Sequence, residues 1–278
     1  MSAESILHYR FPDGARTLAV RLDVAGPRAL LESFYSSYQR AEPNQEAACT
    51  ISLAREGAGY RLIGPSGDWE AADEGEAVLY YESELTGALL EDAGAFVLLH
   101  GAAVCRGAGC LLLVGPSGAG KSTLTLGLYL RGLSALADDA LLIDPASGAV
   151  HPFDRSIRVH ETGLQRLGVD PRDVAGARAC GPYLWLSPGR AGAPGRGPRS
   201  PTALVFLETA DVTALSRLGA AEVLRLLLLA RLGTAARRDF EPLARLATQV
   251  PGYALAYRDF APALDELERL ARPGPARA

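Results

Sequence analysis

Residues 110–131 read CLLLVGPSGAGKSTLTLGLYLR: an apolar run, a glycine-rich loop and an amphipathic helical pattern, in that order. Within this stretch, Gly115–Ser122 matches the pattern G-x-x-x-x-G-K-[ST]. Glycines let the chain curl so that successive backbone N–H groups point at phosphate oxygens, and the N-terminus of the following helix adds partial positive charge. The stretch therefore predicts a phosphate-binding loop between a buried strand, Cys110–Val114, and a helix, Lys121–Arg131.

The loop carries the only lysine of the chain, Lys121, among 28 lysine and arginine residues. In a loop of this kind the ammonium contacts the β- and γ-phosphates, and the hydroxyl of the next residue, Ser122, binds Mg²⁺. Arginine is a wide planar fork and does not replace a compact ammonium in so tight a loop. We expect nine residues to bind the nucleotide: Gly115, Pro116, Ser117, Gly118, Ala119, Gly120, Lys121, Ser122 and Thr123.

Several classes of nucleotide-binding protein are excluded by simple observations. A guanine-reading N-K-x-D element needs a second lysine, and no LSGGQ-like signature of an ABC ATPase follows the loop. A net charge of −4 gives no support to a nucleic-acid-binding surface. The four cysteines show no metal-ligand spacing, and the apolar runs are shorter than a bilayer requires. Kinases and their relatives remain, and we expect a cytoplasmic protein without nucleic-acid or membrane partners.

A pair of adjacent acids, Asp138 and Asp139, follows the helix in the stretch LSALADDALLID. Paired carboxylates at a strand end suit Mg²⁺ coordination by one acid and deprotonation of an acceptor hydroxyl by the other. Upstream, His100 interrupts the apolar run Val97–Val104. A single histidine among apolar residues is usually a core residue, so its role depends on what lies beside it.

These stretches together resemble the catalytic domain of the HPr kinase/phosphorylase family. The series comprises HGA from His100, GPSGAGKST, the pair Arg131-Gly132 and ADD ending at Asp139, and it covers residues 98–144 well. It is closer still to the HPr-kinase-related serine kinases of bacterial gene clusters, including lasso-peptide clusters. The resemblance implies an α/β fold: a P-loop kinase core of the HPr kinase/PEP carboxykinase-like type with a mixed sheet, using ATP and Mg²⁺.

The same resemblance assigns roles to individual residues. Lys121 would contact the β- and γ-phosphates, Asp138 would be the general base on the acceptor hydroxyl, and His100 would support the carboxylates. Ser122 and Asp139 would lie at the metal, although the sequence leaves open which of the two acids takes which role. Thr123 stands where HPr kinases usually have an acidic residue, and the E-x-R-G-x-G signature has no clear counterpart. Both departures weaken the case for HPr itself as the acceptor.

The sequence predicts three regions: a small α+β N-terminal domain over 1–95, the catalytic domain over 96–272 and a frayed tail over 273–278. In the first region we expect a strand at 16–24, a helix at 29–39, a hairpin of 49–54 with 60–63, and a turn at the second GPSG, Gly64–Gly67. In the second we expect helices at 84–95, 121–131, 220–232, 242–248 and 262–272, and strands at 97–104, 110–114, 134–137, 140–144, 204–208 and 253–257.

The expected function is ATP-dependent transfer of a phosphoryl group to a serine hydroxyl of a protein or peptide. Two alternatives stay open at this stage. One is a small-molecule kinase in which 187–201, rich in glycine, proline and arginine, closes over the substrate as a lid. The other is a nucleotide-binding regulatory module without transfer. Kinases of the family often form homo-oligomers, and the sequence leaves the oligomeric state, like the acceptor, open.

Overall fold

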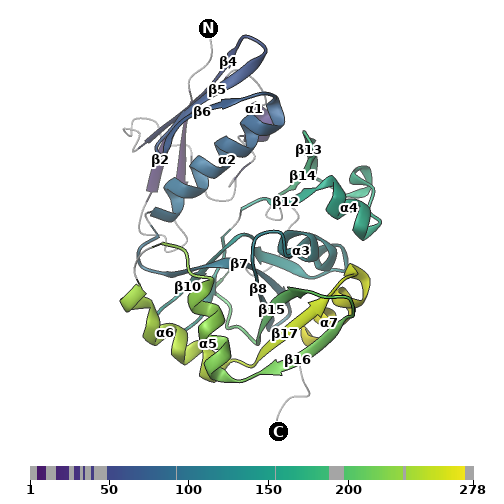
Figure 1. The fold of residues 1–278 in the computed structure, drawn as a ribbon. Helices are drawn as coiled ribbons and strands as arrows, with labels where there is room; N and C mark the ends of the chain where they lie inside the picture. Colours follow the sequence, from purple (N-terminus) through teal and green to yellow (C-terminus); the bar gives the residue numbers. More distant parts are fainter. Residues whose placement is uncertain are drawn as a thin grey trace. The chain divides into compact units, whose positions relative to one another are not determined.

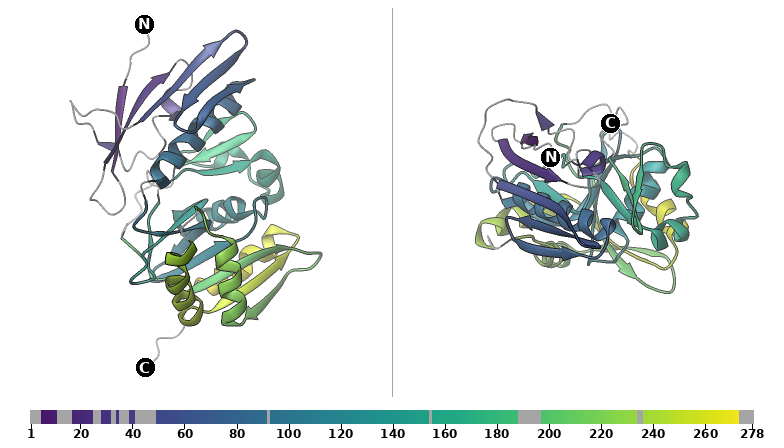
Figure 2. Two further views of the ribbon diagram at one scale, coloured as in Figure 1. Left: turned by 60° about the vertical axis from the view of Figure 1, so that its left-hand side comes forward. Right: turned by 90° about the horizontal axis from the view of Figure 1, so that it is seen from above.

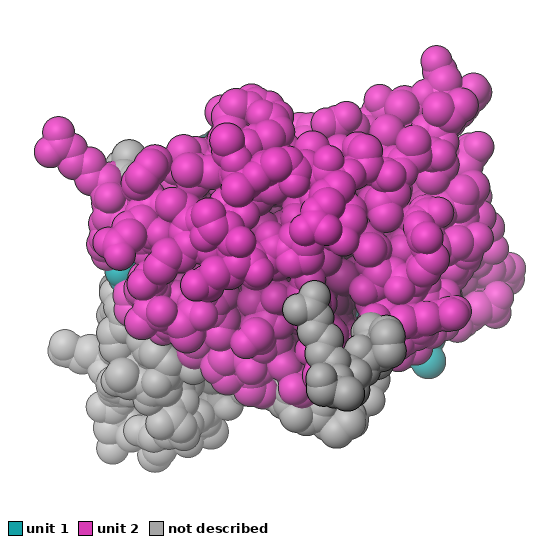
Figure 3. Space-filling view, turned by 90° about the horizontal axis from the view of Figure 1, so that it is seen from below, with its two compact units in different colours: residues 1–94, 154–156, 174–191 teal, residues 95–153, 157–173, 192–278 magenta. Residues whose placement is uncertain are grey.

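The chain forms two compact units in a computed structural model (Figures 1 and 3). The first unit comprises Met1–Gly94, Asp154–Ser156 and Val174–Ala191, and the second comprises Ala95–Phe153, Ile157–Asp173 and Gly192–Ala278. The expected boundary after residue 95 lies beside Gly94, and the first unit also takes in two later segments. The structure describes residues 5–10, 17–24, 28–31, 34, 39–40, 49–91, 93–153, 155–187, 197–233 and 236–272.

The second unit is built on one mixed sheet. Its strand order in the described residues is β11-β10-β7-β8-β15-β17-β16, with β9 also paired to β7. Pairing is parallel between β8 and β15 and between β15 and β17, and antiparallel elsewhere. The strands are β7 (Val97–Arg106), β8 (Gly109–Val114), β9 (Ser134–Ala137), β10 (Ala140–Ile143), β11 (Val150–His151), β15 (Ala203–Thr209), β16 (Ala214–Leu218) and β17 (Gly252–Tyr257).

Helices cover both faces of this sheet. On one face, α3 (Lys121–Leu130) and α7 (Phe260–Leu270) bury leucines and aromatic rings against alternate residues of β7, β8, β15 and β17. On the other face, α5 (Ala220–Leu229) places Val223 so close to Gly252 that a side chain at position 252 has no room. Beside it lies α6 (Ala236–Gln249), as Figure 2 also shows. The short strand β12 (Ile157–His160) and α4 (Glu161–Leu167) pack on α3.

The first unit contains a second mixed sheet. Its strand order is β3-β1-β2-β4-β5-β6 in the described residues, with only the β2–β4 pair parallel. The helix α2 packs on β4, β5 and β6, and β13 pairs with β14 as a hairpin. The elements are β1 (Ser5–Arg10), β2 (Thr17–Val24), α1 (Arg28–Leu31), β3 (Gln39–Arg40), β4 (Cys49–Glu56), β5 (Gly59–Gly64), β6 (Gly67–Ala71), α2 (Glu74–Glu91), β13 (Arg178–Cys180) and β14 (Tyr183–Leu186).

A buried ion pair ties Arg155 to the helix α2 in the first unit. The guanidinium of Arg155 donates to the carboxylate of Glu82 on α2, with Nη2 and Oε2 2.6 Å apart. Both side chains are almost fully buried, at 4% and 0% exposure. A buried guanidinium and carboxylate each require a partner, so this pair fixes where Arg155 lies on the helix.

Most expected elements are confirmed, and the mixed α/β class is confirmed with them. The six strands predicted in the second unit and the hairpin β4–β5 lie where they were predicted, whereas β11, β12 and β16 were not predicted. Gly64–Gly67 makes the turn between β5 and β6, as predicted. The helix expected from residue 84 starts ten residues earlier, at Glu74. The prediction missed this start because the charged residues of the first turn obscure the apolar periodicity. The helix expected at 29–39 is wrong at its end, because Gln39 belongs to β3; within the described residues the helix comprises Arg28–Leu31.

Two further helix boundaries differ from those expected. The helix predicted to begin at Pro242 begins at Ala236 and carries this proline in its interior, and the one predicted to end at Leu232 ends at Leu229. The latter ends early because the next residues leave the helix to bond with β7. The expected tail, 273–278, and residues 188–196 of the expected lid lie outside the described part.

Candidate functional site

The glycine-rich loop joins the end of β8 to the start of α3, as predicted. Gly118 and Gly120 have φ of 80° and 87°, in the left-handed region that favours glycine. The N–H of Ala119 donates to the carbonyl of Pro116 at 3.2 Å, which closes a tight turn within the loop. The helix begins at Lys121 immediately after Gly120, so the loop delivers the chain directly to a helix N-terminus.

The lysine of the loop folds back onto the loop itself. Its Nζ donates to the carbonyls of Gly115 and Pro116, each at 2.8 Å. Burial lowers the pKa of the Lys121 ammonium from its ordinary value, and the carboxylates of Asp139 and Asp138 oppose that shift. The ammonium is therefore a largely desolvated cation placed within electrostatic reach of both acids of the predicted pair.

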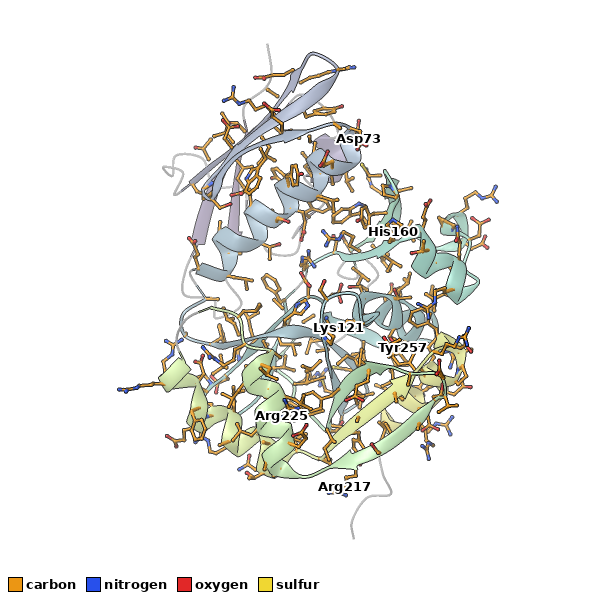
Figure 4. The ribbon with its side chains drawn as sticks, in the orientation of Figure 1. Asp73, Lys121, His160, Arg217, Arg225 and Tyr257 are labelled. Carbon is orange, nitrogen blue, oxygen red and sulfur yellow. The ribbon has the colours of Figure 1, made fainter. Side chains whose placement is uncertain are left out.

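Tyr257, at the end of β17, contacts the loop that precedes Lys121, and Figure 4 labels both residues. Its hydroxyl donates to the carbonyl of Ala119, and its ring packs against Phe260 with ring centres 5.7 Å apart. Burial raises the pKa of this hydroxyl to about 12. The contact also explains why residue 120 is a glycine, because a Cβ at this position would lie 2.5 Å from the Tyr257 hydroxyl oxygen. Sequence reasoning missed Tyr257, because a tyrosine at the end of a predicted strand carries no pattern that marks it as a site residue.

The acidic pair lies in the turn between β9 and β10, and its two members differ sharply. Asp138 is 1% exposed. Asp139 has a φ of 69°, a conformation that a residue other than glycine adopts rarely and that aspartate tolerates better than most. His100 holds it there: the imidazole Nδ1 lies 3.2 Å from the Asp139 carboxylate Oδ1 and 3.0 Å from its backbone carbonyl. The strand register makes this contact, because His100 pairs with Ala140.

A cavity of about 770 Å³ opens beside the loop within the second unit. This volume lies within the range of small-molecule sites, roughly 300–1,000 Å³. Its walls come from the loop, from the carboxyl end of β15, from the end of α5 and from β7. The lining residues are His100, Val114–Ala119, Phe206–Thr209, Leu226 and Leu229–Leu232. Ligands of α/β sheets bind at the carboxyl ends of parallel strands, which is where β8 and β15 end here.

The residues that the sequence assigned to a metal fit Mg²⁺ better than a transition metal. Within the described residues, no group of three or more His, Cys, Asp and Glu side chains is arranged to hold a metal ion. Ser122, in the first turn of α3, and the partly exposed carboxylate of Asp139 offer hard oxygen ligands. Mg²⁺ uses few protein ligands of this kind and completes its shell with phosphate oxygens and water.

Searches against known proteins give distant similarity to solved structures and no match to a family model or a curated protein. Among solved structures, the chain is similar to the Hpr(Ser) kinase/phosphatase from Coxiella burnetii, with 13% identity and a TM-score of 0.34. The match covers 63% of this chain and 88% of that one. An overlap of that size supports neither a shared activity nor a shared site. In the described part of the chain, no helix has the length and apolar character needed to cross a bilayer.

Proposed function

We propose that the chain is an ATP-dependent, Mg²⁺-assisted kinase that transfers the γ-phosphoryl group to a serine hydroxyl of a protein or peptide. One observation carries the proposal. The glycine-rich loop that precedes Lys121 lines one cavity together with His100, whose Nδ1 lies 3.2 Å from the carboxylate of Asp139 in a separate turn. A phosphate-binding cation and a pair of carboxylates beside it are the two parts that phosphoryl transfer requires. We infer a P-loop core of the HPr kinase/PEP carboxykinase-like type on the same grounds.

The loop would hold the triphosphate through its backbone N–H groups and through Lys121. In the structure, the ammonium donates to the carbonyls of Gly115 and Pro116. A bound anion offers this buried cation a stronger, charge-assisted partner. Lys121 would then turn from the loop carbonyls to the β- and γ-phosphates.

The two acids would divide the remaining work. Asp138 would accept the proton of the serine hydroxyl as that oxygen attacks the γ-phosphorus, and the bond to the β-phosphate oxygen breaks. Asp139, fixed by His100, would hold Mg²⁺ together with Ser122. The ion, when bound, neutralises charge on the β- and γ-phosphates. His100 is a positioning residue in this scheme, because it acts through Asp139.

A transfer assay with γ-labelled ATP tests the proposal. Lys121→Ala should lose ATP binding, whereas Asp138→Asn should keep ATP binding and lose transfer by roughly 10²–10⁴-fold. Asp211→Asn, an exposed aspartate in the turn between β15 and β16, is the matched control and should behave as the wild type. Wild-type transfer by Asp138→Asn would refute the assigned base.

The choice of acceptor separates the proposal from its alternatives. Protein extracts, synthetic serine peptides and metabolite mixtures are offered in parallel to the wild type. Label in a protein or peptide that is stable as a phosphoserine supports the proposal. Label confined to metabolites would make the chain a small-molecule kinase, and ATP binding without transfer to any acceptor would make it a regulatory module.

A further inference from the structure

The end of α5 has apolar side chains that are not fully buried against the sheet. The helix sequence AAEVLRLLLL has five leucines, but its fully buried residues are Val223 and Leu227. Leu226 and Leu229 instead line the cavity beside the loop, and Leu229 is 71% exposed. A single exposed leucine needs no explanation. Here, however, the exposed Leu229 and the partly buried Leu226 lie together on the wall of the cavity that the glycine-rich loop also lines, and they form an apolar surface open to a ligand.

An arginine lies directly after this surface and is held in place from behind. The Nε of Arg231 donates to the Asp239 carboxylate at 2.9 Å, and the Asp239 side chain is 3% exposed. Arg231 itself lines the cavity and keeps 13% of its side chain exposed. A desolvated ion pair of this kind is a costly way to gain stability. The pair does, however, fix the orientation of the guanidinium, whose Nη2 also lies 3.5 Å from the Gly233 carbonyl and whose remaining N–H donors are not taken by Asp239.

The backbone places this arginine next to the predicted phosphate end of the cavity. The N–H of His100 donates to the carbonyl of Ala230 at 2.7 Å, and Leu99 forms an isolated β-bridge with Arg231. Arg231 is therefore a near neighbour of the histidine that positions Asp139. Leu226 and Leu229 precede it on the helix, so apolar and cationic surface follow each other along one wall.

We propose that this wall is the nucleoside subsite of the kinase. The base of the nucleotide packs on Leu226 and Leu229. The Arg231 guanidinium binds a phosphate oxygen of the same nucleotide, beside the glycine-rich loop. This inference rests on the proposed function, because it needs the phosphates to lie on Gly115–Ala119. The subsite adds an apolar contact with the base, which a nucleotide has and a bare triphosphate lacks.

Calorimetric binding of MgATP and of magnesium tripolyphosphate to the full chain tests the subsite. Leu229→Asn should weaken ATP binding about tenfold and leave tripolyphosphate binding unchanged, because only the base contacts the leucine. Val212→Asn is the matched control, since Val212 is equally exposed, at 70%, and does not line the cavity. It should change neither affinity. Wild-type ATP affinity in Leu229→Asn would overturn the assignment of the base.

The arginine needs a variant that does not leave Asp239 buried without its partner. The double variant Arg231→Met with Asp239→Asn removes both charges, and a thermal melt verifies that it folds. It should weaken ATP and tripolyphosphate alike, by about tenfold or more. Unchanged affinity for both ligands would overturn the role of Arg231. If the wild type binds neither ligand, the loop itself is not a phosphate site, and the proposed function fails together with the subsite.

Discussion

The packing of the loop on Tyr257 predicts that two neighbouring glycines differ in their tolerance of a methyl group. Gly118 and Gly120 both have left-handed φ values, so alanine at either position costs about 1–2 kcal/mol in backbone strain. At Gly118 a Cβ would meet nothing within 4 Å. At Gly120 it would lie 2.5 Å from the Tyr257 hydroxyl oxygen and 2.9 Å from a ring carbon of Phe260. Both rings are buried and cannot swing aside.

Gly120→Ala should therefore cost an additional ~1–3 kcal/mol of overpacking, for a total of about 2–5 kcal/mol. In a protein of this size 1 kcal/mol corresponds to roughly 2–4 °C in Tm. The expected loss is thus about 4–20 °C for Gly120→Ala against about 2–8 °C for Gly118→Ala, measured by calorimetry and by urea unfolding. Adding Tyr257→Phe removes the nearest clashing atom, so Gly120→Ala should cost less in that background. Equal losses from the two glycine variants, or no relief in the double variant, would refute the packing argument.

Two further predictions concern stability. Arg155→Met leaves the Glu82 carboxylate buried without its cation and should cost about 3–5 kcal/mol in urea unfolding. The control Arg172→Met breaks an exposed pair with Asp170 and should cost about 0–1 kcal/mol; similar costs would mean that burial does not set the strength of the pair. The raised pKa of Tyr257, about 12 against an ordinary 10, has a defined sign: the folded state holds its proton longer, so its contribution to stability is complete below pH 10 and is lost between pH 10 and about 12. Unfolding of Tyr257→Phe across that interval should lack this decline, and an identical slope in the variant would assign it to another group.

Much of the second unit was predicted because its signals are local, although β11, β12, α4 and β16 were not predicted. An apolar run before the loop, an amphipathic helix after it and the short strands Ser134–Ala137 and Ala140–Ile143 were all readable from periodicity. The first unit yields less, because its contacts are distant in sequence. Arg155 reads as an ordinary surface arginine between two expected segments, and only the folded chain brings it to Glu82. No spacing rule predicts a pairing across 73 residues.

The candidate site divides in the same way. The loop residues were recognised from the pattern G-x-x-x-x-G-K-[ST]. The proximity of Lys121 to the acidic pair was expected from the order of the motifs along the chain. Tyr257 and Arg231 carry no pattern, because an aromatic residue at a strand end and an arginine after a helix are common. Their significance lies in what they contact: the Ala119 carbonyl for the tyrosine, and Asp239 together with the cavity for the arginine.

The structure adds most to the description of the acidic pair. Two adjacent aspartates are equivalent in a sequence, but in the folded turn they differ in conformation and in burial. Asp139 is in a left-handed conformation, faces His100 and keeps 36% of its side chain exposed, which suits an acid that must reach a hydrated cation. Asp138 is 1% exposed, which suits the proposed role of general base, because a site closed to water favours proton transfer from the acceptor over side reactions. A desolvated carboxylate accepts a proton more readily than a solvated one, whereas a metal ligand must compete with water for the ion. The asymmetry of burial thus favours Asp138 as the base and Asp139 as the metal partner, for a reason that residue order alone does not contain.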